Sequence, residues 1–401
     1  MTIRTVQLRA VLAVAACCAL LWAGHTRYGP LTAPRLPGTP LAAPVWVKTE
    51  RPGPATVVTG GRAWTTETGG TYLGLAEAGS DENRPFDGSG APGLWSQISP
   101  DGRRLADLDV VVDLADPSRY EVWGAENDEY LRPQAWSPDG RYVAMLANLD
   151  RTVLGQDGRP GDRVLRVIDT RTGRASGDLA AIRWPQWPIL GWAVAFSPDS
   201  EKIAFQDGDR IRIIDLDGKP VTDVPIPAGS RLAGKGAWTR DGDGLLVVSG
   251  ERCDCGAYPV RWTLRTVSIG TGEVSGAGYQ VDGAYAVRVL GWWRSSGQPV
   301  VAEYLPAAGT PVTFFTEPDA EDALVAMRDV ASVRLLRLAP GAEPDILLQA
   351  AAQSIDVADY LINPIPPGGR PLADRHLVAA IGGALTLIAL GVGAVPRRRR
   401  R

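Results

Sequence analysis

Ala135-Trp136-Ser137-Pro138-Asp139-Gly140-Arg141-Tyr142-Val143-Ala144 is the stretch that decides the fold. Proline presets φ at the second position of a turn, an aspartate side chain can accept a hydrogen bond from the backbone just ahead of it, and glycine tolerates positive φ. An aromatic residue stands before the turn and an apolar run follows it. The stretch therefore predicts a tight turn between two antiparallel strands.

The same turn returns along the chain at spacings of 38 to 60 residues. The copies are Ser99-Pro100-Asp101-Gly102, Ser197-Pro198-Asp199-Ser200, which lacks only the glycine, and Thr239-Arg240-Asp241-Gly242, which keeps only the last two residues. After each copy comes a second strand that leads into a glycine turn, as in 166–173, 211–218 and 267–272. A repeat of this length indicates a series of similar antiparallel β-sheets.

One position in the repeat carries a large ring. Trp136, Phe196 and Trp238 each precede a turn at the same distance. A buried aromatic side chain contributes a large apolar area at a fixed geometry. We expect these rings to lie between adjacent sheets.

These residues resemble the WD-repeat-like propellers of the TolB type, whose units open with an aromatic residue and a Ser-Pro-Asp-Gly turn. The resemblance covers roughly Val57 to Ile362, although the WD dipeptide and the Gly-His pair of true WD repeats are absent. It implies four-stranded blades arranged radially around a channel, often used for protein binding. A fold of this kind does not imply one activity.

Six blades are predicted, in an all-β fold. Four are marked by the turns and a fifth opens near 291–297. A sixth is shared between strands near Val57, Ala63-Trp64 and Thr71 and a closing strand at 355–362. Closing the ring in this way removes exposed sheet edges. Seven blades are the alternative, because the gap between Asp139 and Asp199 is long. We interpret that gap as a loop insertion, since its middle is rich in glycine.

Both ends of the chain carry apolar segments. Within residues 1–28, Arg4 and Arg9 precede an uncharged run over 10–24, which is typical of a signal peptide or signal anchor. Residues 14–17 also match the short consensus for lipoprotein processing, so cleavage, lipidation and retention all remain open. Residues 377–395 are uncharged and long enough to cross a bilayer, and the basic tail at 396–401 predicts a cytoplasmic C-terminus.

Proline-rich linkers separate these ends from the repeats. They occupy 29–54 and 363–376, which leaves 55–362 as the propeller. Such linkers stay extended and hold a domain off a surface. Only four of the 42 basic residues are lysines, a composition that favours a GC-rich bacterial genome. The prediction is a bacterial membrane protein with its propeller on the extracytoplasmic side.

Charge narrows the choice of partner. The net charge is −3, and it becomes −10 once the seven arginines of the two ends are set aside. A negative domain argues against nucleic acid and anionic lipid as partners of the propeller. A protein or another cell-envelope component is the expected ligand.

The absence of histidine from the repeats limits the catalytic mechanisms and metal sites that the propeller could support. His25 and His376, the only two, both lie beside the terminal apolar segments. A Ser-His-Asp or Cys-His arrangement within the propeller is therefore excluded, as is an imidazole metal ligand. The sequence also lacks a G-x-S-x-G elbow and a P-loop. No cofactor is predicted. No metal site is predicted either, because the stretches rich in Asp, Glu and Asn side chains do not have the ligand spacing of an EF-hand calcium loop.

Carboxylates are the remaining route to catalysis. A glycoside hydrolase needs two of them flanking a sugar bond, and a lyase or hydrolase of this type predicts acids that converge on the central channel. Most aspartates here are already explained as turn residues. We therefore expect a non-catalytic binding scaffold, with a histidine-independent polysaccharide hydrolase or lyase as the alternative.

Two short motifs are candidate sites. Cys253 and Cys255 are the only cysteines outside the N-terminal segment, and in an oxidising compartment they are expected to form a local disulfide that pins a loop. Redox catalysis ordinarily uses a C-x-x-C spacing instead. Trp184 and Trp187, separated by Pro185 and Gln186, are the best candidates for an exposed recognition loop, with packing between blades as the other interpretation.

Overall fold

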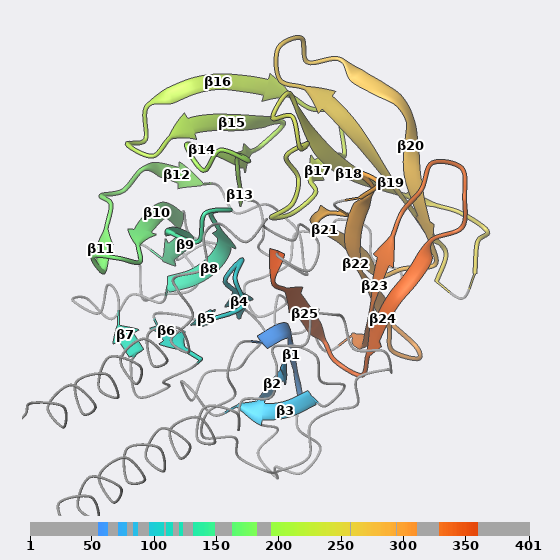
Figure 1. The fold of residues 1–401 in the computed structure, drawn as a ribbon. Helices are drawn as coiled ribbons and strands as arrows, with labels where there is room; N and C mark the ends of the chain where they lie inside the picture. Colours follow the sequence, from blue (N-terminus) through green and yellow to red (C-terminus); the bar gives the residue numbers. More distant parts are fainter. Residues whose placement is uncertain are drawn as a thin grey trace, which may run out of the picture. The chain divides into compact units, whose positions relative to one another are not determined.

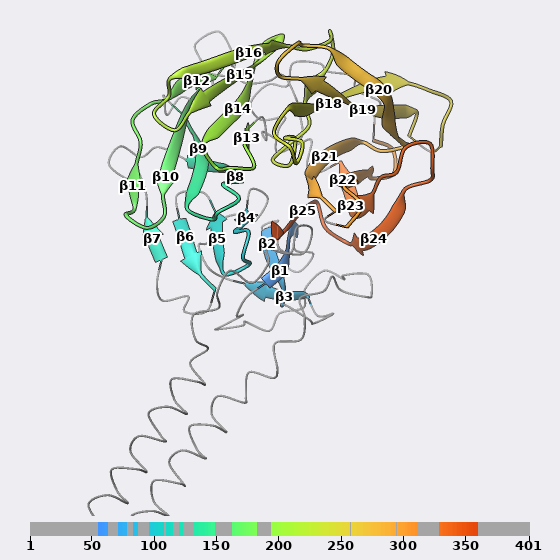
Figure 2. The same ribbon diagram turned by 45° about the horizontal axis from the view of Figure 1, so that its top comes forward.

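The computed structural model is a ring of six antiparallel β-sheets (Figures 1 and 2). It describes residues 55–62, 71–77, 83–86, 96–107, 110–114, 120–122, 131–148, 163–182, 194–256, 258–293, 295–310 and 329–359. These residues all belong to one compact unit that spans 33–364. The regular elements among them are strands throughout, so the predicted all-β propeller is confirmed.

Each blade places its strands in chain order from the inside of the ring outward, and we number the blades along the chain. Blade 1 contains β1 (Ala55–Arg62), β2 (Thr71–Glu77) and β3 (Asn83–Phe86), with β25 (Ser354–Val357) on its inner side; blade 2 contains β4 (Gln97–Ile98), β5 (Arg104–Asp107), β6 (Val110–Asp113) and β7 (Tyr120–Val122); blade 3 contains β8 (Leu131–Trp136), β9 (Tyr142–Asn148), β10 (Arg163–Asp169), β11 (Arg174–Ala175) and β12 (Ala180–Ile182).

The second half of the ring is more regular. Blade 4 contains β13 (Val194–Phe196), β14 (Lys202–Asp207), β15 (Arg210–Asp215) and β16 (Pro220–Pro225); blade 5 contains β17 (Arg231–Leu232), β18 (Gly244–Arg252), β19 (Val260–Ser268) and β20 (Val274–Asp282); blade 6 contains β21 (Ala286–Trp292), β22 (Pro299–Pro306), β23 (Val330–Arg337) and β24 (Asp345–Ala350). The inner strand β21 begins five residues before the glycine-rich run from which its blade was predicted.

The repeated turns form as predicted. In the turn of blade 3, Gly140 N donates to Ser137 O at 2.8 Å, and the Ser137 hydroxyl donates to Asp139 Oδ1 at 2.5 Å. The same bonds recur around Asp101, Asp199 and Asp241. The copy without glycine keeps the geometry, since Ser200 adopts a φ of 64°. A serine therefore accepts the left-handed conformation that glycine provides elsewhere.

The aromatic rings lie between blades, as expected. The indole N–H of Trp136 donates to Gln97 O of blade 2 at 3.0 Å, and that of Trp238 donates to Ala195 O of blade 4 at 3.1 Å. Phe196 is buried in an apolar cluster that includes Ala135 of blade 3. Each ring thus joins its own inner strand to that of the preceding blade, and the tryptophans also satisfy a buried carbonyl.

Strands from the two ends of the propeller close the ring. β25 pairs with β1 in antiparallel register from Val57↔Val357 to Gly60↔Ser354. The long stretch after Asp139 adds no seventh blade among the described residues, because β9, β10, β11 and β12 all belong to one sheet. Six blades are therefore correct. The expected strand at Ala63-Trp64 lies outside the described residues.

The predictions for the termini also fall outside the described residues, namely the apolar segments at 1–28 and 377–395, the linkers and the basic tail. In the part of the chain that the structure does describe, no helix combines the length and apolarity that crossing a membrane requires.

Candidate functional site

A buried ion pair lies among the inner strands, between residues far apart in the sequence. Lys235 follows β17 in blade 5, and its Nζ is 2.9 Å from Asp356 Oδ1 on β25 of blade 1. The two side chains are 6% and 1% exposed. The same ammonium donates to Val357 O at 3.1 Å. Lysine and aspartate are rarely buried unless paired, and here each provides the other with that partner.

Two glycines place the lysine. Val289 N of β21 donates to Ala233 O at 2.7 Å, and Gly236 N donates to Val289 O at 3.2 Å, so the segment pairs with the inner strand of blade 6. A Cβ on Gly234 would lie 2.5 Å from Arg288 Cγ, and one on Gly236 would overlap the backbone of β21. Only glycine, which has no Cβ, fits at positions 234 and 236 on either side of Lys235.

Blades 6 and 2 complete this cluster. Arg288 Nη2 donates to Ile355 O at 2.6 Å and lies 3.6 Å from Asp356 Oδ1. Ile98 N on the inner strand of blade 2 donates to Asp356 Oδ2 at 3.1 Å. Close by, Tyr304 on β22 is fully buried, and burial raises the pKa of its hydroxyl to about 12. We call Lys235, Arg288, Tyr304, Asp356 and Asp359 the closure cluster.

A second carboxylate shares the lysine. Asp359 Oδ1 is 3.5 Å from Lys235 Nζ. Burial raises the pKa of Asp359 and outweighs the attraction of the nearby ammonium. Asp356 and Asp359 thus both contact one cation. General acid–base chemistry requires a carboxyl group within reach of a substrate proton, whereas these two groups are directed at the protein itself.

Another buried acid is also paired. Glu303 on β22 is 1% exposed. It receives two hydrogen bonds from the Arg334 guanidinium on β23, Nε to Oε2 at 2.5 Å and Nη2 to Oε1 at 2.8 Å. This bidentate arrangement is the strong form of an arginine–carboxylate contact. The acid serves to hold two strands of blade 6 together.

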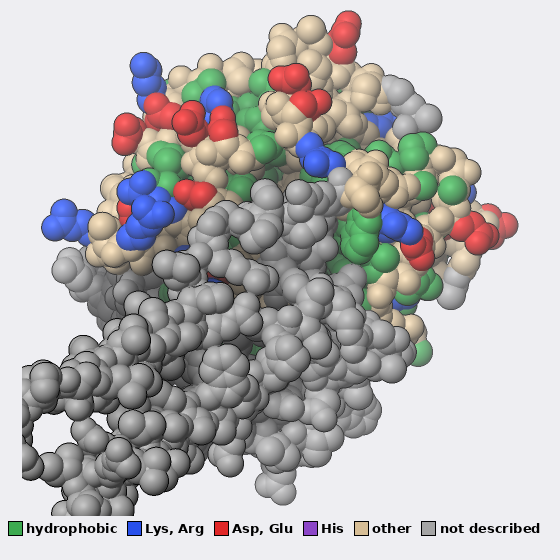
Figure 3. All heavy atoms as spheres, viewed as in Figure 1, with side chains coloured by type: hydrophobic (Ala, Val, Ile, Leu, Met, Phe, Trp, Pro, Cys, Tyr) green, Lys and Arg blue, Asp and Glu red, His purple; other side chains and the backbone are tan. Residues whose placement is uncertain are grey.

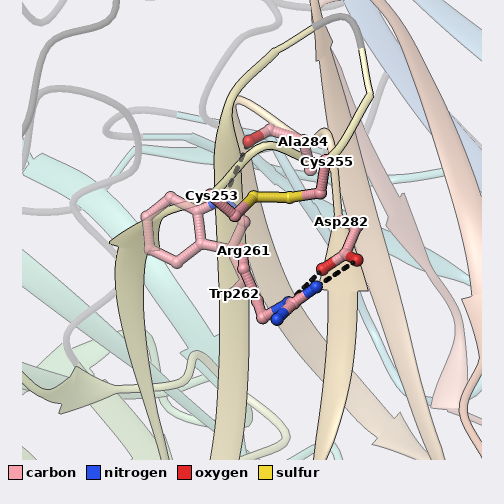
Figure 4. Close-up of a disulfide and its surroundings, with 6 residues drawn as sticks. All are labelled: Cys253, Cys255, Arg261, Trp262, Asp282 and Ala284. Atoms are coloured by element: carbon pink, nitrogen blue, oxygen red, sulfur yellow. Dashed lines mark hydrogen bonds and ion pairs between the residues drawn. A yellow bond between two sulfur atoms is a disulfide. The ribbon is translucent and has the colours of Figure 1, made fainter.

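The predicted cysteine pair lies in the loop between β18 and β19. Figure 4 shows the disulfide that joins Cys253 and Cys255, whose Cα atoms are 5.3 Å apart. Cys253 N donates to Pro259 O at 3.1 Å across the base of the loop. On the strands just below, the Arg261 guanidinium forms two bonds to the Asp282 carboxylate at 2.8 and 3.0 Å. The crosslink and this ion pair both stiffen the same end of blade 5.

The other predicted site cannot be described. Trp184 and Trp187 lie outside the described residues, between β12 and β13. The nearest described residues on either side are Ile182, which pairs with Arg163 at the start of β10, and Val194, which pairs with Phe205 near the end of β14. The recognition loop therefore stays a prediction. The described residues contain no group of three or more His, Cys, Asp or Glu side chains arranged to hold a metal.

The described surface carries both signs of charge. Figure 3 shows lysine and arginine side chains interspersed with aspartate and glutamate over the visible outer strands. On blade 4, for example, Arg210 and Arg212 lie 3.7 and 3.6 Å from the Asp223 carboxylate. Such mixed surfaces do not attract polyanions strongly.

Comparison with known proteins supports the fold and does not identify a function. No protein-family model matches the chain, and no curated protein matches it. Oligogalacturonate lyase from Vibrio parahaemolyticus aligns over 71% of this chain and 72% of its own, with a TM-score of 0.42 and 11% identity. TolB from Acinetobacter baumannii aligns over 74% and 82%, with a TM-score of 0.32 and 15% identity. Hydrazine synthase from Kuenenia stuttgartiensis aligns over 75% and 67%, with a TM-score of 0.34 and 14% identity. The resemblance to the WD-repeat-like family therefore stays a prediction beyond the fold.

Sequence reasoning missed the closure cluster. Lys235 is one of only four lysines and stands between two glycines, and Asp356 stands between the apolar residues Ile355 and Val357. Those two anomalies were the available signals. Neither shows that residues 121 positions apart in the chain would meet.

Proposed function

We propose that this protein is a non-catalytic, membrane-anchored β-propeller that binds a protein or another envelope component on the extracytoplasmic side of a bacterial membrane. The observation that carries the proposal is the pairing of three acids with cations of the protein itself: Asp356 and Glu303, each 1% exposed, and Asp359, 27% exposed. Asp356 and Asp359 contact Lys235, and Glu303 contacts Arg334. Carboxylates held in this way stabilise the ring and are not directed at a substrate.

The alternative, a histidine-independent polysaccharide hydrolase or lyase, requires a different arrangement. Retaining glycosidases hold two carboxyl groups ~5 Å apart and inverting ones hold them ~6.5–9.5 Å apart, with the sugar between them. In the closure cluster both acids are instead within ion-pair distance of one ammonium group, at 2.9 and 3.5 Å from Lys235 Nζ. No described observation favours the enzymatic alternative.

Membrane attachment is supported by the sequence of the two ends. An epitope inserted after Gly309, which is exposed and has open space around its Cα, should be reached by antibody in cells whose inner membrane is intact. The C-terminal arginine tail should become accessible only after permeabilisation. Detection of both epitopes only after permeabilisation would refute the proposed topology.

The absence of catalysis is tested separately from topology. Purified full-length protein in detergent should release no products from cell-wall or capsular polysaccharide during prolonged incubation. Asp356→Asn should leave that result unchanged. Product release by the wild-type protein would refute the non-catalytic proposal, and its loss in an Asp356→Asn variant that is still folded would assign the activity to Asp356.

A further inference from the structure

The disulfide between Cys253 and Cys255 contributes little to the stability of the propeller. The two cysteines are two positions apart in the chain, so the closed loop contains a single intervening residue. A disulfide stabilises a fold mainly by restricting the unfolded chain, and this effect becomes smaller as the closed loop becomes shorter. Both cysteines lie in the loop between β18 and β19, so the crosslink joins no two strands or blades.

Other contacts hold this hairpin without the help of the sulfur atoms. β18 and β19 are paired along their whole lengths, and Cys253 N donates to Pro259 O at 3.1 Å just beyond the last pair. Tyr258 packs edge-on against Tyr285, which precedes β21 of blade 6, with ring centroids 5.7 Å apart. Both ends of the loop are therefore fixed by groups that stay in place when the cysteines are reduced.

The disulfide lies in an exposed part of the chain (Figure 4). Cys253 and Cys255 are each partly exposed, and Asp254 and Gly256 beside them are exposed. Exposed disulfides are more easily reduced than buried ones and are the ones that take regulatory or catalytic roles. Thiol–disulfide exchange requires an accessible sulfur atom and an attacking thiolate, and no particular spacing of the two cysteines. A crosslink that is open to solvent and nearly dispensable for the fold meets that requirement.

We infer that Cys253 and Cys255 form a thiol–disulfide exchange site, whose reactant is a thiol group carried by a small molecule or by a cysteine side chain of another protein. This activity goes beyond the proposed binding function and does not depend on it. The site oxidises thiols when its own cysteines are joined, and a disulfide of the same reactant restores the crosslink by the reverse reaction.

The exchange proceeds in two balanced steps. A thiolate R–S⁻ attacks one cysteine sulfur and forms a mixed disulfide, while the bond between Cys253 and Cys255 breaks and the displaced cysteine leaves as a thiolate that takes a proton from water. A second R–S⁻ then attacks the R sulfur of the mixed disulfide. R–S–S–R forms, and the other cysteine leaves in the same way. Two thiols are thereby oxidised and the two cysteines are reduced.

The charge beside the sulfur atoms determines which thiols react fastest. Asp254 is exposed and stands between the two cysteines, so its carboxylate lies within roughly 10 Å of either sulfur. Charges at that distance are only partly screened at moderate salt. Glu251 adds another negative charge and Arg252 a positive one, so the segment 251–254 is negative overall. A cationic thiol should therefore approach the disulfide more readily than an anionic one.

Reactivity is measured on the folded full-length protein in detergent, with Cys17→Ser and Cys18→Ser so that no other cysteine takes part. The reference is a synthetic peptide of residues 251–256 that is closed by the same disulfide and has no fold around it. 2-Mercaptoethanol should open the disulfide of the protein at a rate within about tenfold of that of the peptide, measured by alkylation of the released thiols and mass spectrometry. A rate about a hundredfold or more below that of the peptide would overturn the exchange site.

The stability of a variant without the crosslink is the second measurement. Cys253→Ser combined with Cys255→Ser, in the same background, should unfold at nearly the same urea concentration as the parent protein, because the hairpin is held by other contacts. A midpoint well below that of the parent would show that the disulfide is a structural crosslink and would overturn the inference.

Charged thiols test the preference and the source of the reactant. Cysteamine should react several-fold faster than thioglycolate at low ionic strength, once each rate is divided by its rate with the uncharged disulfide of 2-mercaptoethanol. Asp254→Asn should lower that ratio at least about twofold, and an unchanged ratio would overturn the role of Asp254. A cysteine peptide flanked by lysines is then compared with cysteamine. Its reaction would identify protein cysteines as reactants, and reaction of the small thiols alone would identify a small-molecule source; both results support the exchange site.

Discussion

Replacing Lys235 by methionine should lower the free energy of unfolding by about 3 kcal/mol. Methionine keeps most of the apolar stem and removes the charge, so Asp356, only 1% exposed, loses its closest cation. Breaking a buried ion pair from one side costs ~3–5 kcal/mol because the other charge stays buried. Ile98 N at 3.1 Å and Arg288 at 3.6 Å remain beside the carboxylate. The expected loss is therefore at the lower end of that range.

The assay is urea-induced unfolding of the full-length protein in detergent, followed by tryptophan fluorescence, in which the shift in midpoint is multiplied by the m-value. Arg210→Met is the matched control. Its partner Asp223 lies 3.7 Å away, and the two side chains are 52% and 44% exposed. An exposed pair of this kind contributes less than about 1 kcal/mol. If Lys235→Met is no more destabilising than Arg210→Met, the closure cluster does not stabilise the ring as argued.

A double variant separates the charge effect from packing. Lys235→Met with Asp356→Asn removes both charges together, and an asparagine oxygen can still accept the hydrogen bond from Ile98 N. The double variant should therefore be at least about 1 kcal/mol more stable than the sum of the two single losses predicts, because contacting residues couple. Additive losses would show that the two side chains do not interact.

Three further predictions follow from single features. Gly236→Ala should lower the free energy of unfolding by several kcal/mol, because the added Cβ would lie 2.5 Å from the carbonyl carbon of Leu290. The control is Gly177→Ala, which has open space around it and should change the free energy of unfolding by less than about 1 kcal/mol. Equal effects of the two variants in urea unfolding would contradict this prediction. The hydrogen bond from the Thr239 hydroxyl, followed by that from Asp243 N, lowers the pKa of Asp241 below its ordinary 3.8. A carboxyl group whose pKa is lower in the folded than in the unfolded state stabilises the fold above the unfolded pKa, and this stability is lost as pH falls through the folded pKa. Asp241→Asn should therefore flatten the pH dependence of the urea midpoint below pH 4. An unchanged pH profile in the variant would contradict this prediction. In a variant without the two N-terminal cysteines, the denatured chain should show no free thiol before reduction and two afterwards; two thiols beforehand would exclude the disulfide.

The fold was largely predictable because its signals are local and repeated. In the turn of blade 3, the serine, aspartate and glycine all lie within four residues, and each makes its bond inside that turn. Four such turns in step with apolar strands leave few arrangements other than a propeller. The copy at Ser200 shows the limit of the pattern, since nothing in the sequence indicates that a serine adopts a φ of 64° there.

The candidate site was not predictable for the opposite reason. Lys235 and Asp356 are brought together by the closure of the whole ring, and no local spacing encodes that contact. The enzymatic alternative predicts acids that converge on the central channel, whereas the structure shows Asp356 and Asp359 each in contact with Lys235. Their shared partner could not be foreseen, since the position of the ammonium group depends on how Gly234 and Gly236 let their segment approach β21.

The location of the closure cluster has a physical reason. In the other blades the first two strands of the sheet follow one another in the chain, so a short connection keeps them together. β25 and β1 come from opposite ends of the propeller, and four residue pairs join them. Closing so long a loop costs entropy that a short hairpin avoids. Asp356 on β25 contacts blade 5 through Lys235, blade 6 through Arg288 and blade 2 through Ile98. The buried charges thus tie the last strand to three other blades at the one junction that lacks a connecting turn.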